Sequence, residues 1–159
     1  KAGGFSLTPA RPVEETDFSL FTRGISNFNA AGNYGFAAGV YFGHIGNVRI
    51  GAEAGQLAIY APSLTSGAES EVLFGSFVFH YNINSLSISE NFYPYAQLSL
   101  GGTEFGPLGN MMLGLQYDLT SFLSINAGLD GNLIYYNRSV GPSEIINNYG
   151  ITGGLIFNF

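Results

Sequence analysis

The chain is too poor in charge for an ordinary soluble domain and too polar for a bundle of membrane helices. Of its 159 residues only 10% are charged, against about 25% in a soluble domain, yet its mean hydropathy is just +0.20. No apolar run approaches the roughly 18 residues of a membrane-spanning helix. A net charge of −6 disfavours a nucleic-acid partner, and the absence of cysteine excludes disulfides and thiolate metal sites.

The first 16 residues show no sustained alternation of apolar and polar side chains. They contain Pro9 and Pro12, which cannot donate to a sheet ladder, followed by Glu14 and Glu15. We therefore expect residues 1–16 to form an N-terminal tail and residues 17–159 to form one β domain.

From Asp17 onward apolar and polar side chains alternate with a period of two, which is typical of strands with one apolar and one polar face. The pattern predicts eight strands, at residues 17–28, 33–44, 47–60, 71–82, 92–101, 109–119, 122–136 and 148–159. Tilted strands of this length cross a bilayer, and a single-chain bacterial barrel has an even number of them. The apolar face is then outward, since a soluble barrel would need many Lys and Glu there.

The first three segments differ in clarity. Segment 17–28 is the weakest, because Phe21 and Ile25 share a face with Ser19 and Arg23. The next two segments give clear outward rows, which are Tyr34, Phe36, Ala38, Val40 and Phe42, then Val48, Ile50, Ala52 and Ala54. The third segment thereby places Arg49 and Glu53 inward.

The middle two segments are ambiguous. In segment 71–82, Leu73 and Phe74 fall out of phase with the alternation that follows them, so we expect a β-bulge at this point. Segment 92–101 carries Pro94, which is awkward in a barrel without edges, and either of its faces could be outward.

The last three segments alternate most regularly, with amides and acids on the face opposite the apolar row. Their outward rows are Met111, Leu113, Leu115, Tyr117 and Leu119; Leu123, Ile125, Ala127, Leu129, Leu133 and Tyr135; and Tyr149, Ile151, Gly153, Leu155, Phe157 and Phe159. Aromatic residues near the strand ends also suit the headgroup boundary of a membrane as girdles. These are Tyr34, Tyr81, Tyr117, Phe122, Tyr135, Tyr149, Phe157 and Phe159.

The connections fall into two alternating sets. One set, at 45–46, 83–91 and 120–121, should be the shorter periplasmic turns, and the other, at 29–32, 61–70, 102–108 and 137–147, the outer loops. The link at 83–91 is too long for its set. Either the next strand begins earlier, using Leu86 and Ile88, or this turn is elaborated.

Two segments and the closing strand carry a family resemblance. Residues 114–127, GLQYDLTSFLSINA, and residues 94–102, PYAQLSLGG, resemble strands of the OmpA/OmpX-like superfamily of small outer-membrane barrels. The row Tyr149, Leu155, Phe157 and Phe159 resembles the membrane-insertion signal that the barrel assembly machinery reads. The resemblance implies an eight-stranded antiparallel up-and-down barrel in the outer membrane, surrounded by lipid and lipopolysaccharide, with a periplasmic C-terminus.

The charged lumen is the best-defined candidate site. Its residues are Arg23, Arg49, Glu53, Gln116, Asp118 and Asp130, with Asn126 and Asn132 as further partners. Buried charges persist only when they are paired and hydrogen-bonded, so we expect a structural network that fills the barrel. The alternative is a gate whose pairs exchange partners and admit ions or small solutes, as in a porin-like pore.

An enzymatic role is disfavoured. Lipid A deacylases of this fold type resemble one another by a His-x-Ser pair, and neither His44 nor His80 supplies it. Ser76 and His80 share a face but stand roughly 13 Å apart along a strand. Two unrelated histidines offer no metal site, and no cofactor is expected.

Binding or adhesion is the remaining class. Loop 61–70 is polar and rich in Ser and Gly, and loop 137–147 carries the apolar pair Ile145 and Ile146. These loops, or the tail 1–16, could contact another envelope protein. The sequence thus predicts an outer-membrane barrel with a filled, charged lumen that acts in adhesion or as a subunit of an envelope complex; a pore is the alternative, and a lipid A or phospholipid modifying enzyme a distant one.

Overall fold

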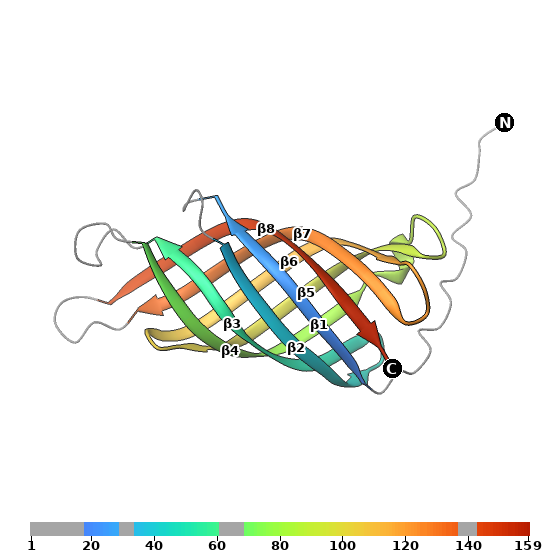
Figure 1. The fold of residues 1–159 in the computed structure, drawn as a ribbon, viewed down its shortest axis with the longest axis horizontal. Helices are drawn as coiled ribbons and strands as arrows, with labels where there is room; N and C mark the ends of the chain where they lie inside the picture. Colours follow the sequence, from blue (N-terminus) through green and yellow to red (C-terminus); the bar gives the residue numbers. More distant parts are fainter. Residues whose placement is uncertain (1–17, 29–33, 61–68, 137–142) are drawn as a thin grey trace.

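The computed structural model describes residues 18–28, 34–60, 69–136 and 143–159, which form a closed antiparallel β-barrel (Figure 1). Each strand pairs with its neighbours in the chain, and β1 pairs with β8 to close the ring. The strands are β1 (Ser19–Asn27), β2 (Tyr34–Ile45), β3 (Val48–Tyr60), β4 (Glu69–Asn82), β5 (Phe92–Thr103), β6 (Gly106–Asp118), β7 (Leu123–Tyr136) and β8 (Glu144–Asn158). The predicted tail 1–16 and the loop portions 29–33, 61–68 and 137–142 lie outside the described residues.

All eight predicted strands are present, and the largest differences are at the starts of β6 and β8. The expected long loop at 102–108 is wrong, because β5 and β6 pair as far as Thr103 and Gly106. The Thr103 hydroxyl closes this tight turn by accepting hydrogen bonds from the backbone N–H groups of Phe105 and Gly106. Strand β8 begins four residues earlier than predicted, because Glu144 still pairs with Tyr136 of β7.

Three links lie at the same end of the barrel as Phe159, which we call the turn end; the opposite end is the loop end (Figure 1). Between β2 and β3 the turn uses Gly46 with a φ of +58°, a left-handed conformation that favours glycine. The long link between β4 and β5 contains a 3₁₀ turn, η1 (Asn84–Leu86), and β5 starts at Phe92. Of the two alternatives, the elaborated turn is therefore correct. In the described residues no helix is long and apolar enough to cross a membrane.

The β-bulge expected in segment 71–82 is absent. Strand β4 alternates without interruption from Glu71 to Asn82, with Leu73 outward and Phe74 inward, so Phe74 is an aromatic side chain of the lumen. The register shift that does occur lies between Tyr41 and Gly43, where β2 meets β3.

The two strands with unclear faces are also settled. In β1 the face shared by polar and apolar residues is the inner one, and it is buried from Ser19 to Asn27. In β5 the inner face holds Tyr93, Tyr95, Gln97 and Ser99, so Leu98 and Leu100 point outward.

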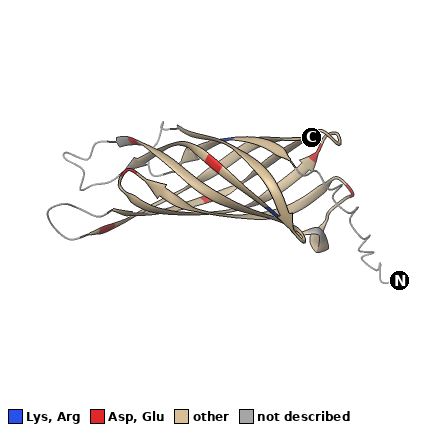
Figure 2. Ribbon diagram, turned by 90° about the horizontal axis from the view of Figure 1, so that it is seen from below, with Lys and Arg blue, Asp and Glu red and all other residues tan. Residues whose placement is uncertain are grey.

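The outer wall between the two ends is apolar. Large exposed apolar side chains cover it on every strand except β3, for example Phe36 at 60%, Phe77 at 63% and Leu129 at 63%. On β3 the outward Val48, Ile50 and Ala52 are half-buried. Figure 2 shows the charged residues mainly at the two ends, with a few at mid-height. The charged residues Arg23, Glu53 and Asp130 are buried, so these charges lie inside the barrel and not on its apolar outer wall.

Candidate functional site: a layered lumen

Four layers of side chains fill the lumen, and the inner face of β1 samples them in order. From the turn end to the loop end this face presents Ser19, Phe21, Arg23 and Ile25, all buried. Each belongs to a different layer, made with side chains from the other strands.

The layer nearest the loop end is an apolar cluster that sequence reasoning missed. We call it the loop-end cluster, and its members are Ile25, Ala37, Leu57, Ile59, Val72, Phe74, Leu108, Ile134 and Ile146. Phe105 and Tyr136 pack against it with their rings edge to face, 5.2 Å apart. The out-of-phase Phe74 was the sequence signal that could have revealed it. This cluster fills the lumen with apolar side chains on the loop-end side of Arg23.

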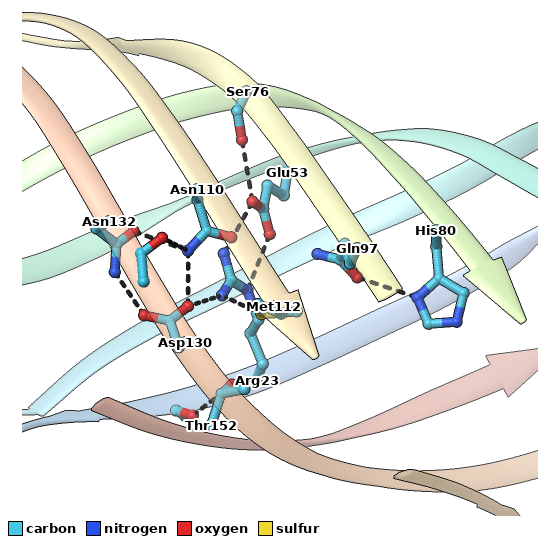
Figure 3. Close-up of polar contacts among 12 residues, drawn as sticks. Arg23, Glu53, Ser76, His80, Gln97, Asn110, Met112, Asp130, Asn132 and Thr152 are labelled. Carbon is cyan, nitrogen blue, oxygen red and sulfur yellow. Dashed lines mark hydrogen bonds and ion pairs between the residues drawn. The ribbon is translucent and has the colours of Figure 1, made fainter. Parts of the chain in front are cut away.

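The second layer, which we call the central belt, is ionic (Figure 3). The Arg23 guanidinium donates to both Glu53 carboxylate oxygens, with Nε to Oε2 at 3.0 Å and Nη2 to Oε1 at 2.9 Å. Its Nη1 donates to Asp130 Oδ2 at 3.2 Å. Three of the six residues predicted for the lumen network thus meet here, although they come from β1, β3 and β7.

Neutral side chains complete the hydrogen bonding of both carboxylates. The Ser76 hydroxyl donates to Glu53 at 3.0 Å, while the Asn110 and Asn132 amides donate to Asp130 at 2.6 and 2.5 Å. Each carboxylate therefore accepts three hydrogen bonds. Charge-assisted bonds are stronger than neutral ones, so the network stabilises the buried ions.

The third layer is a row of rings across the lumen. Phe21 stacks on Tyr41 with ring centroids 4.5 Å apart, Tyr41 lies 5.5 Å from His80, and His80 stacks on Tyr95 at 4.9 Å. We call these four residues the aromatic row. Glycine makes room for it, since a Cβ at Gly39 would lie 2.5 Å from the Phe21 ring.

The fourth layer, at the turn end, contains the other three predicted network residues. Tyr93 donates its hydroxyl to the Asp118 carboxylate at 2.8 Å, and Gln116 donates to the Tyr93 oxygen at 2.7 Å. Arg49 donates to Asn158 at 3.2 Å and lies over the Tyr41 ring. No ion pair joins Arg49 to Asp118 in the part of the chain that the structure describes.

Among the described residues, neither histidine is hydrogen-bonded to a serine. His80 faces the lumen, as predicted, but its ring nitrogens contact Gln97 at 3.1 Å and Asn82 at 2.8 Å. Ser76 is bonded to Glu53 instead, and His44 is exposed. Within the described ranges no three His, Asp or Glu side chains gather as a metal-ligand group.

The predicted membrane-insertion row lies on the outward face of β8 and just beyond it. Tyr149, Leu155 and Phe159 are exposed, and Phe157 is half-buried. Phe122 meets the Phe159 ring edge to face at 5.3 Å and lies 5.8 Å from the Phe157 ring, so these three phenylalanines form an aromatic patch at the turn end.

A closed eight-stranded barrel with an apolar outer wall and a polar, filled interior defines the class of small transmembrane β-barrels. No protein-family model matches the chain, and no curated protein sequence matches it significantly.

Solved structures do match. Neisserial surface protein A (NspA) aligns with a TM-score of 0.63 at 17% identity, covering 90% of this chain and 97% of NspA. The N-terminal β-barrel domain of Pseudomonas aeruginosa OprF aligns with a TM-score of 0.60 at 16% identity, covering 89% of this chain and 96% of OprF's domain. A de novo designed transmembrane β-barrel aligns with a TM-score of 0.61 at 9% identity, covering 96% of this chain and 100% of the design. The fold is therefore that of outer-membrane barrels such as NspA and OprF.

Proposed function

We propose that this chain is an integral protein of the bacterial outer membrane and acts as a structural or interaction scaffold, in adhesion or as a subunit of an envelope complex. The observation that carries the proposal is the reversed polarity of a sealed barrel. The outer wall is apolar, whereas the interior is occupied in sequence by the loop-end cluster, the central belt and the aromatic row.

The same proposal includes the orientation and the partners. The turn end, with the C-terminus, faces the periplasm, because short connections are typical of that side. Lipid and lipopolysaccharide surround the apolar wall, and the barrel assembly machinery reads the row Tyr149, Leu155, Phe157 and Phe159. An envelope partner would bind at the loops or the tail, which lie largely outside the described residues. We also propose that the chain is a member of the OmpA/OmpX-like superfamily. Residues 94–102 and 114–127 support this part of the proposal.

The test combines two measurements on one detergent-refolded sample. We expect faster gel migration before boiling than after it, because a closed barrel stays compact in detergent, together with no sustained current in a planar bilayer. Resolved openings would favour the alternative of a small-solute or ion pore. The absence of a heat-dependent shift would contradict the barrel itself.

Lipid modification is the distant alternative. The lack of a Ser–His contact around His80 supports a non-enzymatic role. We expect lipid A and phospholipids incubated with the refolded barrel to keep their masses, and a deacylated product would overturn this part of the proposal.

A further inference from the structure

The central belt contains two carboxylates but only one guanidinium. Arg23 contacts both Glu53 and Asp130, and the three side chains are at most 3% exposed. No other basic side chain of the described residues forms an ion pair with either carboxylate. Each carboxylate accepts three hydrogen bonds, and two carboxylates against one guanidinium leave the belt one positive charge short of neutrality unless a further cation or a proton is bound there.

No group that faces the belt from the other strands brings a second positive charge into contact with Glu53 or Asp130 among the described residues. Met112 from β6 and Thr152 from β8 are neutral, and the loop-end cluster above is apolar. The aromatic row below holds Tyr41 from β2, His80 from β4 and Tyr95 from β5. Among these only His80 has a side chain that could carry a positive charge, and both of its ring nitrogens contact amides rather than the belt.

A second observation points to where a cation would sit. The Oδ1 atom of Asn110 is buried and has no hydrogen-bond partner among the described residues, and the same holds for Oγ of Ser99. These residues pair in the register of β5 and β6. In Figure 3 the Asn110 nitrogen is directed at Asp130, while its oxygen points to the side of Glu53. A buried amide oxygen and a buried hydroxyl that accept no hydrogen bond are costly, and a cation bound to them would satisfy both.

We propose that the central belt binds one monovalent cation, either a proton or an alkali-metal ion, among the oxygens of Glu53, Asn110 and Ser99. One positive charge neutralises the belt, whereas a divalent ion would reverse the imbalance. Oxygen ligands suit both a hard metal ion and a shared proton. The loop-end cluster and the aromatic row close the belt on both sides, so the cation is taken up as the barrel folds.

The experiment follows the folding equilibrium of the full chain by urea titration in lipid vesicles. If the belt binds a proton, the folded state holds one more proton than the unfolded state. Raising the pH from 6 to 9 at constant salt then lowers the folding constant tenfold per pH unit. At fixed pH, uptake of one sodium ion raises the folding constant tenfold per decade of NaCl that replaces choline chloride. We expect one of these two dependences in the wild type.

Variants test whether the dependence on pH or NaCl comes from the carboxylates of the central belt. Asp130→Asn removes the imbalance and should abolish the dependence, and Glu53→Gln serves the same purpose if Asp130→Asn does not fold. Asp118→Asn is the matched control, since it removes a lumen carboxylate outside the belt and should leave the dependence intact. The proposal is overturned if the wild type matches the belt variants in both titrations, or if His80→Asn abolishes the pH dependence, which would place the proton on the histidine.

Discussion

At the residue scale, aromatic side chains in the lumen pack against glycines, which leave room for their rings. Tyr41 and Phe21 cross the lumen next to Gly39 and Gly51, where a Cβ would lie within 3 Å of one of the two rings. The alternation of the sequence predicts which residues of segment 33–44 point outward. It cannot predict which rings fill the space beside Gly39, because Phe21 comes from a different strand and Tyr41 lies at a different height.

The close fit at Gly39 leads to a prediction. In Gly39→Ala the new methyl group would lie 2.4 Å from the Ala52 carbonyl oxygen and 2.5 Å from the Phe21 ring, so the barrel must distort. We expect a loss of about 1–3 kcal/mol in the free energy of unfolding, measured by urea titration in vesicles. Gly43→Ala on the same strand is the control, since nothing lies within 4 Å of its Cβ. Equal effects of the two substitutions would contradict this packing.

At the element scale, each strand carries one face for lipid and one for the lumen. The regular strands β6, β7 and β8 were readable because their inner faces are mostly polar, so the period of two separates the faces cleanly. Strand β4 was misread because its inner face changes from apolar to polar along its length, with Val72 and Phe74 in the loop-end cluster and Ser76 at the central belt. An apolar residue on both faces looks like a phase break, although the backbone alternates without one.

The lipid-facing role of β7 can be tested by the depth at which a charge is introduced. Leu129 lies outward beside the central belt at mid-height, whereas Tyr135 lies near the loop end. We expect Leu129→Arg to lower the free energy of unfolding in vesicles by about 2–4 kcal/mol, and Tyr135→Arg by only about 0–1 kcal/mol. Leu129→Ala controls for the lost side chain. If arginine costs the same at both positions, the outward face of β7 is not in hydrocarbon.

At the scale of the whole molecule, the pairing of strands into a closed ring and the filling of its lumen by side chains are separate properties. Strand pairing from β1 round to β8 removes all sheet edges, which a membrane requires. Three layers of different chemistry occupy the lumen at successive heights, and two of them, the loop-end cluster and the aromatic row, were not predicted.

Because several layers fill the lumen, we expect that truncating side chains in one layer does not open a channel. Ile59 and Ile134 are fully buried in the loop-end cluster, and truncating either to alanine should cost about 2–5 kcal/mol of stability. We nevertheless expect Ile59→Ala/Ile134→Ala to show no sustained current in a planar bilayer, because the central belt and the aromatic row remain. A steady current would mean that the loop-end cluster is the sole seal.

The sequence by itself determined the number of strands, their order and the outward face of most of them, because the period of two is a local property that every strand repeats. It also placed Arg23, Glu53 and Asp130 inward at similar heights. Only the tertiary structure decided which of these charges meet, because β1, β3 and β7 are not all neighbours in the sheet and contact one another only through the lumen of the closed barrel. For the same reason no pattern along the chain predicts that Arg49 pairs with Asn158 rather than with Asp118, or that the buried oxygen of Asn110 has no hydrogen-bond partner. Both follow from how side chains of different strands fill a shared volume.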